Sequence, residues 1–86
     1  MTKGEQMMAD LGYKKHMGTP TELRKEKDHA LFYFENIDEA SVIAFSHYYG
    51  ESELSVRSFC GGGLSSFYGD ELLACAEIIK EIKSYD

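Results

Sequence analysis

The middle of the chain, from residue 21 to residue 60, consists of short apolar runs separated by polar turns. Runs of about four to eight residues that are rich in aromatic and β-branched side chains are typical of antiparallel strands. We therefore expect extended segments at 21–26, 30–34, 40–47 and 54–60. Within the third, alternation places Ile43 and Phe45 on one face of the sheet and Val42 and Ala44 on the other.

Helical spacing replaces this alternation at the N-terminus. Thr2 is followed three residues later by Glu5, which is the capping-box pattern of a helix start. An apolar stripe at helical spacing comes next, and Gly12 stands where a left-handed residue ends a helix. The pattern predicts a short helix from about residue 3 to residue 11, held in place by its stripe of Met7, Met8 and Leu11.

The clearest amphipathic pattern lies at the other end of the chain, between residue 66 or 69 and Lys83. Apolar residues recur there at intervals of three and one, and charged residues lie largely opposite them. We expect a C-terminal helix whose buried face consists of Leu72, Cys75, Ala76, Ile79 and Ile82.

Two further segments contain turn residues. Residues 14–21 include Gly18 and Pro20 and are expected to form a loop, and Gly61–Gly63 ends the last strand abruptly. The predicted order is a short N-terminal helix, a three- to four-stranded antiparallel meander sheet and a C-terminal amphipathic helix packed on one face. This is an α+β fold in a single small domain, residues 1–86.

Composition limits the possible classes of protein. The chain has 86 residues, 43% hydrophobic and 28% charged, which suits one folded domain and excludes two. We find neither a run of about 20 apolar residues, as a membrane helix needs, nor a secretory signal, so we expect no membrane association and a cytoplasmic location. The net charge of −6 disfavours direct nucleic-acid binding. An alternative remains, a nucleic-acid binder using the basic segment from Lys14 to Lys27.

Little in the sequence supports catalysis or a cofactor. Cys60 and Cys75 are too few for a disulfide framework, and no pair of cysteines or histidines has metal-ligand spacing, so we expect neither a metal nor a cofactor. Cys75 lies on the apolar helix face and is expected in the core. The alternative of a thiol-dependent enzyme or redox protein would use Cys60 beside the glycine run, with His47 as its nearest base.

Aromatic side chains exceed what a single covered sheet face can bury, since there are eleven of them. Alternation prevents Phe32 and Phe34 from sharing a face with Leu31 and Tyr33, so one of these pairs faces away from the helices. Exposed aromatic residues near carboxylates are typical of protein interfaces. We expect a partner-binding surface formed by Tyr33, Tyr48, Tyr49, Glu51, Glu53, Phe67 and Tyr68.

A resemblance adds to this interpretation. The segments Met8–Lys15 and Lys25–Lys27, the aromatic strand and the terminal helix with Glu71-Leu72 near its start resemble small bacteriophage and prophage proteins of Gram-positive bacteria. The chain departs from their pattern at Phe59–Gly63 and in its ending, Lys83–Asp86. The resemblance implies an α+β fold and a phage-encoded accessory role, and it transfers no catalytic residue. The leading hypothesis is therefore a non-enzymatic protein that binds a host or phage protein, with a homodimer as a further alternative.

Overall fold

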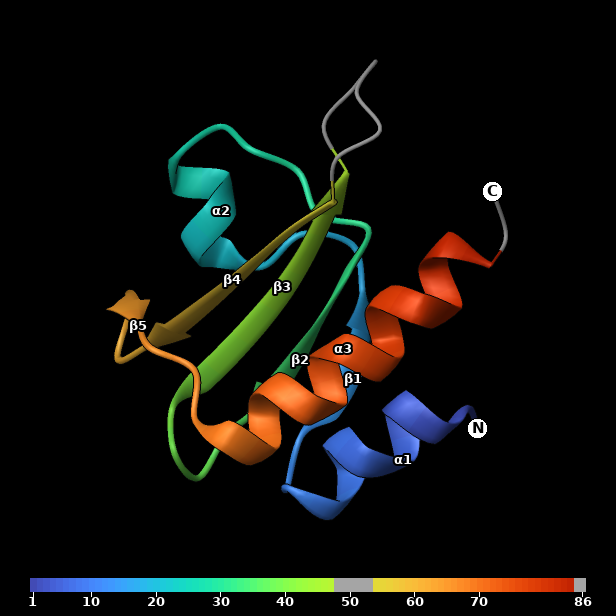
Figure 1. The fold of residues 1–86 in the computed structure, drawn as a ribbon. Helices are drawn as coiled ribbons and strands as arrows, with labels where there is room; N and C mark the ends of the chain where they lie inside the picture. Colours follow the sequence, from blue (N-terminus) through green and yellow to red (C-terminus); the bar gives the residue numbers. More distant parts are fainter. Residues whose placement is uncertain (48–53, 85–86) are drawn as a thin grey trace.

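The computed structural model describes residues 1–47 and 54–84 (Figure 1). Within these described residues, three helices and five strands follow one another. Their bounds are α1 (Lys3–Asp10), β1 (Lys14–Met17), α2 (Thr21–Lys25), β2 (Phe32–Asn36), β3 (Ser41–His47), β4 (Leu54–Cys60), β5 (Gly63–Ser65) and α3 (Gly69–Lys83). The predicted α+β class is confirmed. The turn expected between β3 and β4 lies outside the described residues.

The sheet is a meander, because its spatial order β1-β2-β3-β4-β5 repeats the order in the sequence. Every neighbouring pair is antiparallel, so a turn is enough to join each strand from β2 onward to the next. The sheet has five strands where three or four were expected. The additional strand β5 follows a turn in which Gly61 and Gly62 have φ values of +61° and +88°, which favour glycine.

The expectations for Lys14–Met17 and Thr21–Lys25 were wrong, whereas residues 18–20 form the expected loop. Lys14–Met17 was expected to be a loop and is the edge strand β1, whereas Thr21–Lys25 was expected to be extended and is helix α2. Pro20 explains the second difference, because its φ of −70° and extended ψ suit the residue that precedes a helix. Lysines are compatible with β1 because an edge strand keeps charged side chains in solvent.

The main core lies between the sheet and the helices α1 and α3, which are side by side in Figure 1. As alternation predicted, Ile43 and Phe45 share this face, and Phe34 joins them from β2. Phe34 and Phe45 meet edge to face with their ring centroids 5.9 Å apart. The helices contribute buried residues to the same cluster, namely Met8, Ala74, Cys75 and Ile78.

The two helices approach each other closely at Gly4. A Cβ atom at this position would lie 2.6 Å from Cγ1 of Ile78, so a larger residue would push the helices apart. The Gly4 amide also donates to Oε1 of Glu81 at 2.8 Å. Gly4 therefore fixes the position of α1 against the second half of α3.

Helix α2 covers part of the opposite face of the sheet, although the sequence predicted helices on one face only. Leu23 of α2 is fully buried against Val42, Ala44 and Phe59, which form a second, smaller core. Arg57 of β4 holds the segment that follows α2 in place, because its Nη2 lies 2.6 Å from Oδ2 of Asp28. The pKa of Asp28 is lowered, first by the hydrogen bond from the His29 amide and then by Arg57.

The buried face of α3 differs from the predicted one. Ala74, Cys75 and Ile78 are buried, whereas Leu72 and Ala76 are exposed. The prediction for Cys75 was therefore correct, and that for Leu72 and Ala76 was wrong. Among the described residues, none of the helices has both the length and the apolar character needed to cross a membrane.

Candidate functional site

The largest exposed apolar side chains of α3 gather at its N-terminal half. Tyr68, directly before the helix, is 75% exposed, Leu72 is 53% exposed and Leu73 is 61% exposed. Tyr68 and Leu72 are four residues apart and so are neighbours on the helix surface. Leu73 extends the apolar surface toward α1, where it lines a shallow hollow of about 180 Å³ with Met7, Asp10, Leu11 and Asp70. We call these seven residues the α1–α3 patch.

The hydrogen bonds of Glu71 determine which side of the first turn of α3 faces the sheet. Its Oε1 accepts a hydrogen bond from the Tyr68 amide at 3.1 Å, and its Oε2 accepts one from the Tyr13 hydroxyl. Tyr13 is buried between α1 and β1, and burial together with the Glu71 carboxylate raises its pKa. Glu71 thus turns toward the sheet, and Leu72 and Leu73 are left facing solvent.

The structure separates the predicted partner-binding residues. Tyr68 belongs to the α1–α3 patch, while Phe67 packs partly buried against the main core. Tyr33 lies on the opposite face of the sheet, where it stacks on His16 with ring centroids 5.0 Å apart and contacts the second core. These three therefore do not form one surface. The other four predicted residues, Tyr48, Tyr49, Glu51 and Glu53, lie outside the described residues.

A polar hollow of about 290 Å³ surrounds the exposed Cys60 at the end of β4. Cys60 donates weakly from its Sγ to the Glu39 carbonyl at 3.7 Å, and Glu39 and Glu71 are among the residues that line the hollow. His47 is not brought to it, because Cys60 pairs with Ser41 at one end of the β3–β4 ladder and His47 pairs with Leu54 at the other. The backbone positions of Cys60 and His47 therefore lie at opposite ends of the ladder, whereas a thiol enzyme would need them close together.

The two cysteines are expected to react at very different rates. Cys60 is exposed, and its hollow is lined by carboxylates and hydroxyls with no cationic side chain, so we expect it to react no faster than an ordinary exposed thiol. Burial raises the pKa of Cys75 to about 12, so we expect its labelling to be at least about tenfold slower than that of Cys60. Labelling with Ellman's reagent measures both rates, with Cys60→Ser as the control. Faster reaction of Cys60 than of a free thiol would contradict this expectation.

The basic segment from Lys14 to Lys27 does not form one continuous surface. Lys15 points to the α1 side of the sheet, where its Nζ lies 3.6 Å from a Glu5 oxygen. Lys14 lies on the other face, and Arg24 and Lys27 line a small hollow near α2. The cations are therefore divided between the two faces. Among the described residues, no three histidine, cysteine or acidic side chains gather as a metal site would require.

Comparison with known protein families, with curated proteins and with solved structures finds no match for this chain. The candidate site therefore depends on geometry alone. The sequence prediction included Tyr68, which is exposed, but it did not include Leu73 and it assigned Leu72 to the core. The sequence contains one signal that some apolar residues of α3 are exposed: their number exceeds what one buried stripe of a helix holds.

Proposed function

We propose that this domain is a non-enzymatic protein-binding module whose α1–α3 patch docks on a partner protein. The observation that carries the proposal is the exposure of Tyr68, Leu72 and Leu73 within six consecutive positions at the start of α3. A tyrosine and two leucines grouped with a hollow between helices correspond to the apolar centre of an interface. A phage-encoded accessory role is part of the same proposal, supported only by the resemblance of the sequence.

Charge defines the chemistry of the partner. Asp10 and Asp70 are the charged members of the patch, and both are acidic. Asp10 accepts a hydrogen bond from the neighbouring Gln6 at 2.9 Å, and neither aspartate forms an ion pair within the described part of the chain. With a net charge of −6, the chain attracts a basic surface. The partner is therefore a protein whose contact surface combines apolar side chains with lysine or arginine.

The test compares the wild-type chain with a Leu72→Ser/Leu73→Ser double variant. The partner is captured on the immobilised wild-type domain, identified and purified, and its affinity for each variant is measured by calorimetry. We expect the double variant to bind at least about tenfold more weakly, because truncation of central interface residues costs more than about 1 kcal/mol. Both leucines are exposed, so the fold and the circular dichroism spectrum should be unchanged.

Leu64→Ser is the matched control, since Leu64 is an exposed apolar residue on β5, outside the patch. It should bind the partner as the wild type does. Equal affinity of the double variant and the wild type would contradict the proposal. Self-association that the double variant abolishes, measured by sedimentation, would instead assign the patch to a homodimer.

A further inference from the structure

Strand β1 is an edge of the sheet and, in the part of the chain that the structure describes, pairs with β2 alone. Just after β1, the Gly18 amide donates to the Leu31 carbonyl of the chain leading into β2, at 3.4 Å. Residues along an antiparallel strand alternate between facing their neighbour and facing away. His16 thus faces β2 with its backbone, and the N–H and C=O groups of Lys15 and Met17 point away from the sheet. An added strand would find its hydrogen-bond partners there.

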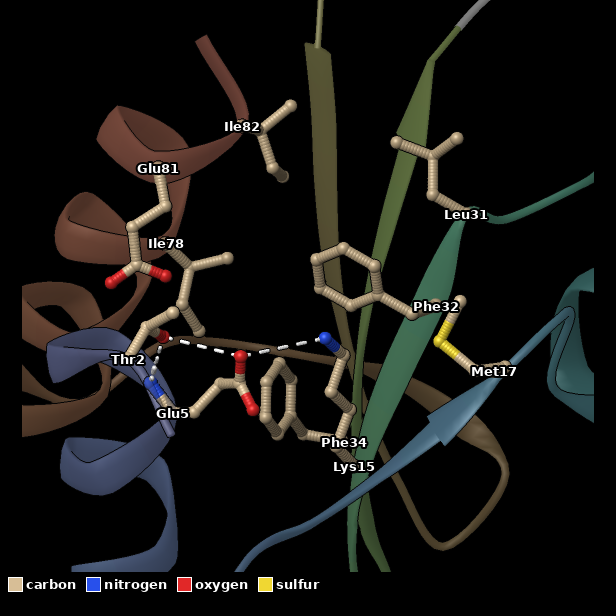
Figure 2. Close-up of a pocket in the computed structure, with 10 residues that line it drawn as sticks. All are labelled: Thr2, Glu5, Lys15, Met17, Leu31, Phe32, Phe34, Ile78, Glu81 and Ile82. Carbon is tan, nitrogen blue, oxygen red and sulfur yellow. Dashed lines mark hydrogen bonds and ion pairs between the residues drawn. The ribbon is translucent and has the colours of Figure 1, made fainter. Parts of the chain in front are cut away.

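An apolar hollow of about 460 Å³ opens beside these residues, between the sheet and the helices (Figure 2). Met17, Leu31 and Phe32 line its sheet side, and Ile78 and Ile82 lie across from them. Met17 is 75% exposed and Leu31 is 42% exposed. Because Lys15 and Met17 also line the hollow, an added strand would direct every second side chain to the same face of the sheet. The free edge and the apolar hollow are therefore parts of one continuous surface.

The charges on this surface favour an acidic strand. β1 carries two lysines and no carboxylate, and Lys14 forms no ion pair with any described residue. The carboxylates in the hollow already have partners, because Glu5 is near Lys15 and Glu81 accepts from the Gly4 amide. On the opposite face, Nε2 of His16 lies 3.3 Å from Glu35. Glu35 is opposite Lys14 in the register but lies near His16, so Lys14 has no ion pair among the described residues and could be neutralised by a new carboxylate.

A second copy of the chain fits this edge poorly. Antiparallel pairing of two β1 strands about an axis through Lys15 would set Lys15 opposite itself and Lys14 opposite His16. An axis through His16 would set two histidines opposite each other and leave Lys14 beyond the end of the partner strand, opposite Gly18. The first arrangement is destabilised by the two Lys15 side chains directly opposite each other, and in both arrangements two chains of net charge −6 repel each other.

We propose that the β1 edge binds an extended acidic and apolar segment of a partner protein, which adds to the sheet as a further strand. Its apolar side chains lie on the face of Lys15 and Met17 and enter the hollow. Its carboxylates lie on the other face, opposite Lys14 and His16. This inference goes beyond the function proposed for the α1–α3 patch, because it uses other residues and a partner of opposite charge.

The probe is a capped, fluorescein-labelled peptide of about eight residues in which valine and glutamate alternate. Two control peptides are alternating valine and lysine, and the same valines and glutamates in two blocks. Fluorescence anisotropy should show that the alternating acidic peptide binds at least about tenfold more tightly than either control. In NMR spectra, hydrogen exchange of the Lys15 and Met17 amides should slow when this peptide is bound.

Variants of the protein locate the binding. Lys14→Glu should weaken the alternating acidic peptide, whereas Lys25→Glu, at an exposed lysine of α2, should leave binding unchanged. Met17→Pro should abolish binding, because it removes an outward N–H that the sheet does not use. If Met17→Pro fails to fold, peptides N-methylated at alternate residues test the same hydrogen bonds without changing the protein. Two methylation patterns are possible, and one of them should abolish binding.

Several results would overturn the proposal. Among them are no binding of the alternating acidic peptide, equal binding of the two-block peptide, and NMR changes centred on α3 away from β1. A homodimer that Met17→Pro disrupts would assign the edge to a second copy and would also overturn it. Leu72→Ser/Leu73→Ser should bind the peptide as the wild type does, so failure of this inference and failure of the proposed function are distinguishable.

Discussion

Phe34→Ala should destabilise the domain by about 3–5 kcal/mol, the range for truncation of a buried aromatic residue. Phe34 is almost fully buried at the centre of the main core, and it contacts Phe32 and Phe45 edge to face, with ring centroids 5.8 and 5.9 Å apart. Alanine would leave a cavity between the sheet and both long helices. In a domain of this size the loss corresponds to a melting temperature lower by roughly 15–30 °C.

Urea denaturation and thermal melts followed by circular dichroism measure this effect. Leu64→Ala is the control, because Leu64 is exposed and its truncation should change the free energy of unfolding by no more than about 0.5 kcal/mol. A Phe34→Ala variant that unfolds within about 1 kcal/mol of the wild type would show that the helices are not held on this face of the sheet by the phenylalanine cluster.

The strands were predictable where the sequence contains a short run of apolar residues. In β3, parity separates Ile43 and Phe45 from Val42 and Ala44, and the structure confirms this separation, because one pair lies in each core. In β1 no such pattern exists, because Lys14 and Lys15 are both polar and the strand depends on pairing with β2. The sequence contains no local signal for a strand of that kind.

Helix α2 shows the limit of local reasoning for short elements. Thr21–Lys25 has five residues, too few for a helical period to be recognised, and Leu23 is its single buried side chain. Its position results from tertiary contacts, because Leu23 fills the space over Val42, Ala44 and Phe59. These contacts join segments that are about 20 or more residues apart in the sequence.

The α1–α3 patch was missed for a different reason. Apolar residues occupy so many positions of α3 that stripes differing by one residue are equally plausible from sequence. In the structure, two contacts determine which stripe of α3 is buried. They are the hydrogen bond from Tyr13 to Glu71 and the close approach of Gly4 to Ile78. Both involve residues more than fifty positions apart, and both turn Leu72 and Leu73 outward.

The raised pKa values of two buried groups near α3 predict a loss of stability at alkaline pH. Burial raises the pKa of Cys75 from 9.0 to about 12, and burial with the Glu71 carboxylate raises the pKa of Tyr13 above its ordinary value of 10.0. Folding favours the neutral form of each group, so their contribution is complete below pH 9. Above pH 9 the unfolded chain loses the Cys75 proton first, and above pH 10 the Tyr13 proton, while the folded chain retains both.

The free energy of unfolding should therefore fall by about 1 kcal/mol per pH unit between pH 9 and pH 10, and more steeply above pH 10. Urea denaturation at successive pH values under reducing conditions measures the slope. Cys75→Ala should remove the loss that begins near pH 9, and Tyr13→Phe the loss that begins near pH 10, because each variant lacks the group that titrates. Cys60→Ser should keep the wild-type slope, since Cys60 is exposed in the folded chain. An unchanged slope in the double variant Cys75→Ala/Tyr13→Phe would show that other groups cause the alkaline loss and that burial of these two side chains is not its source.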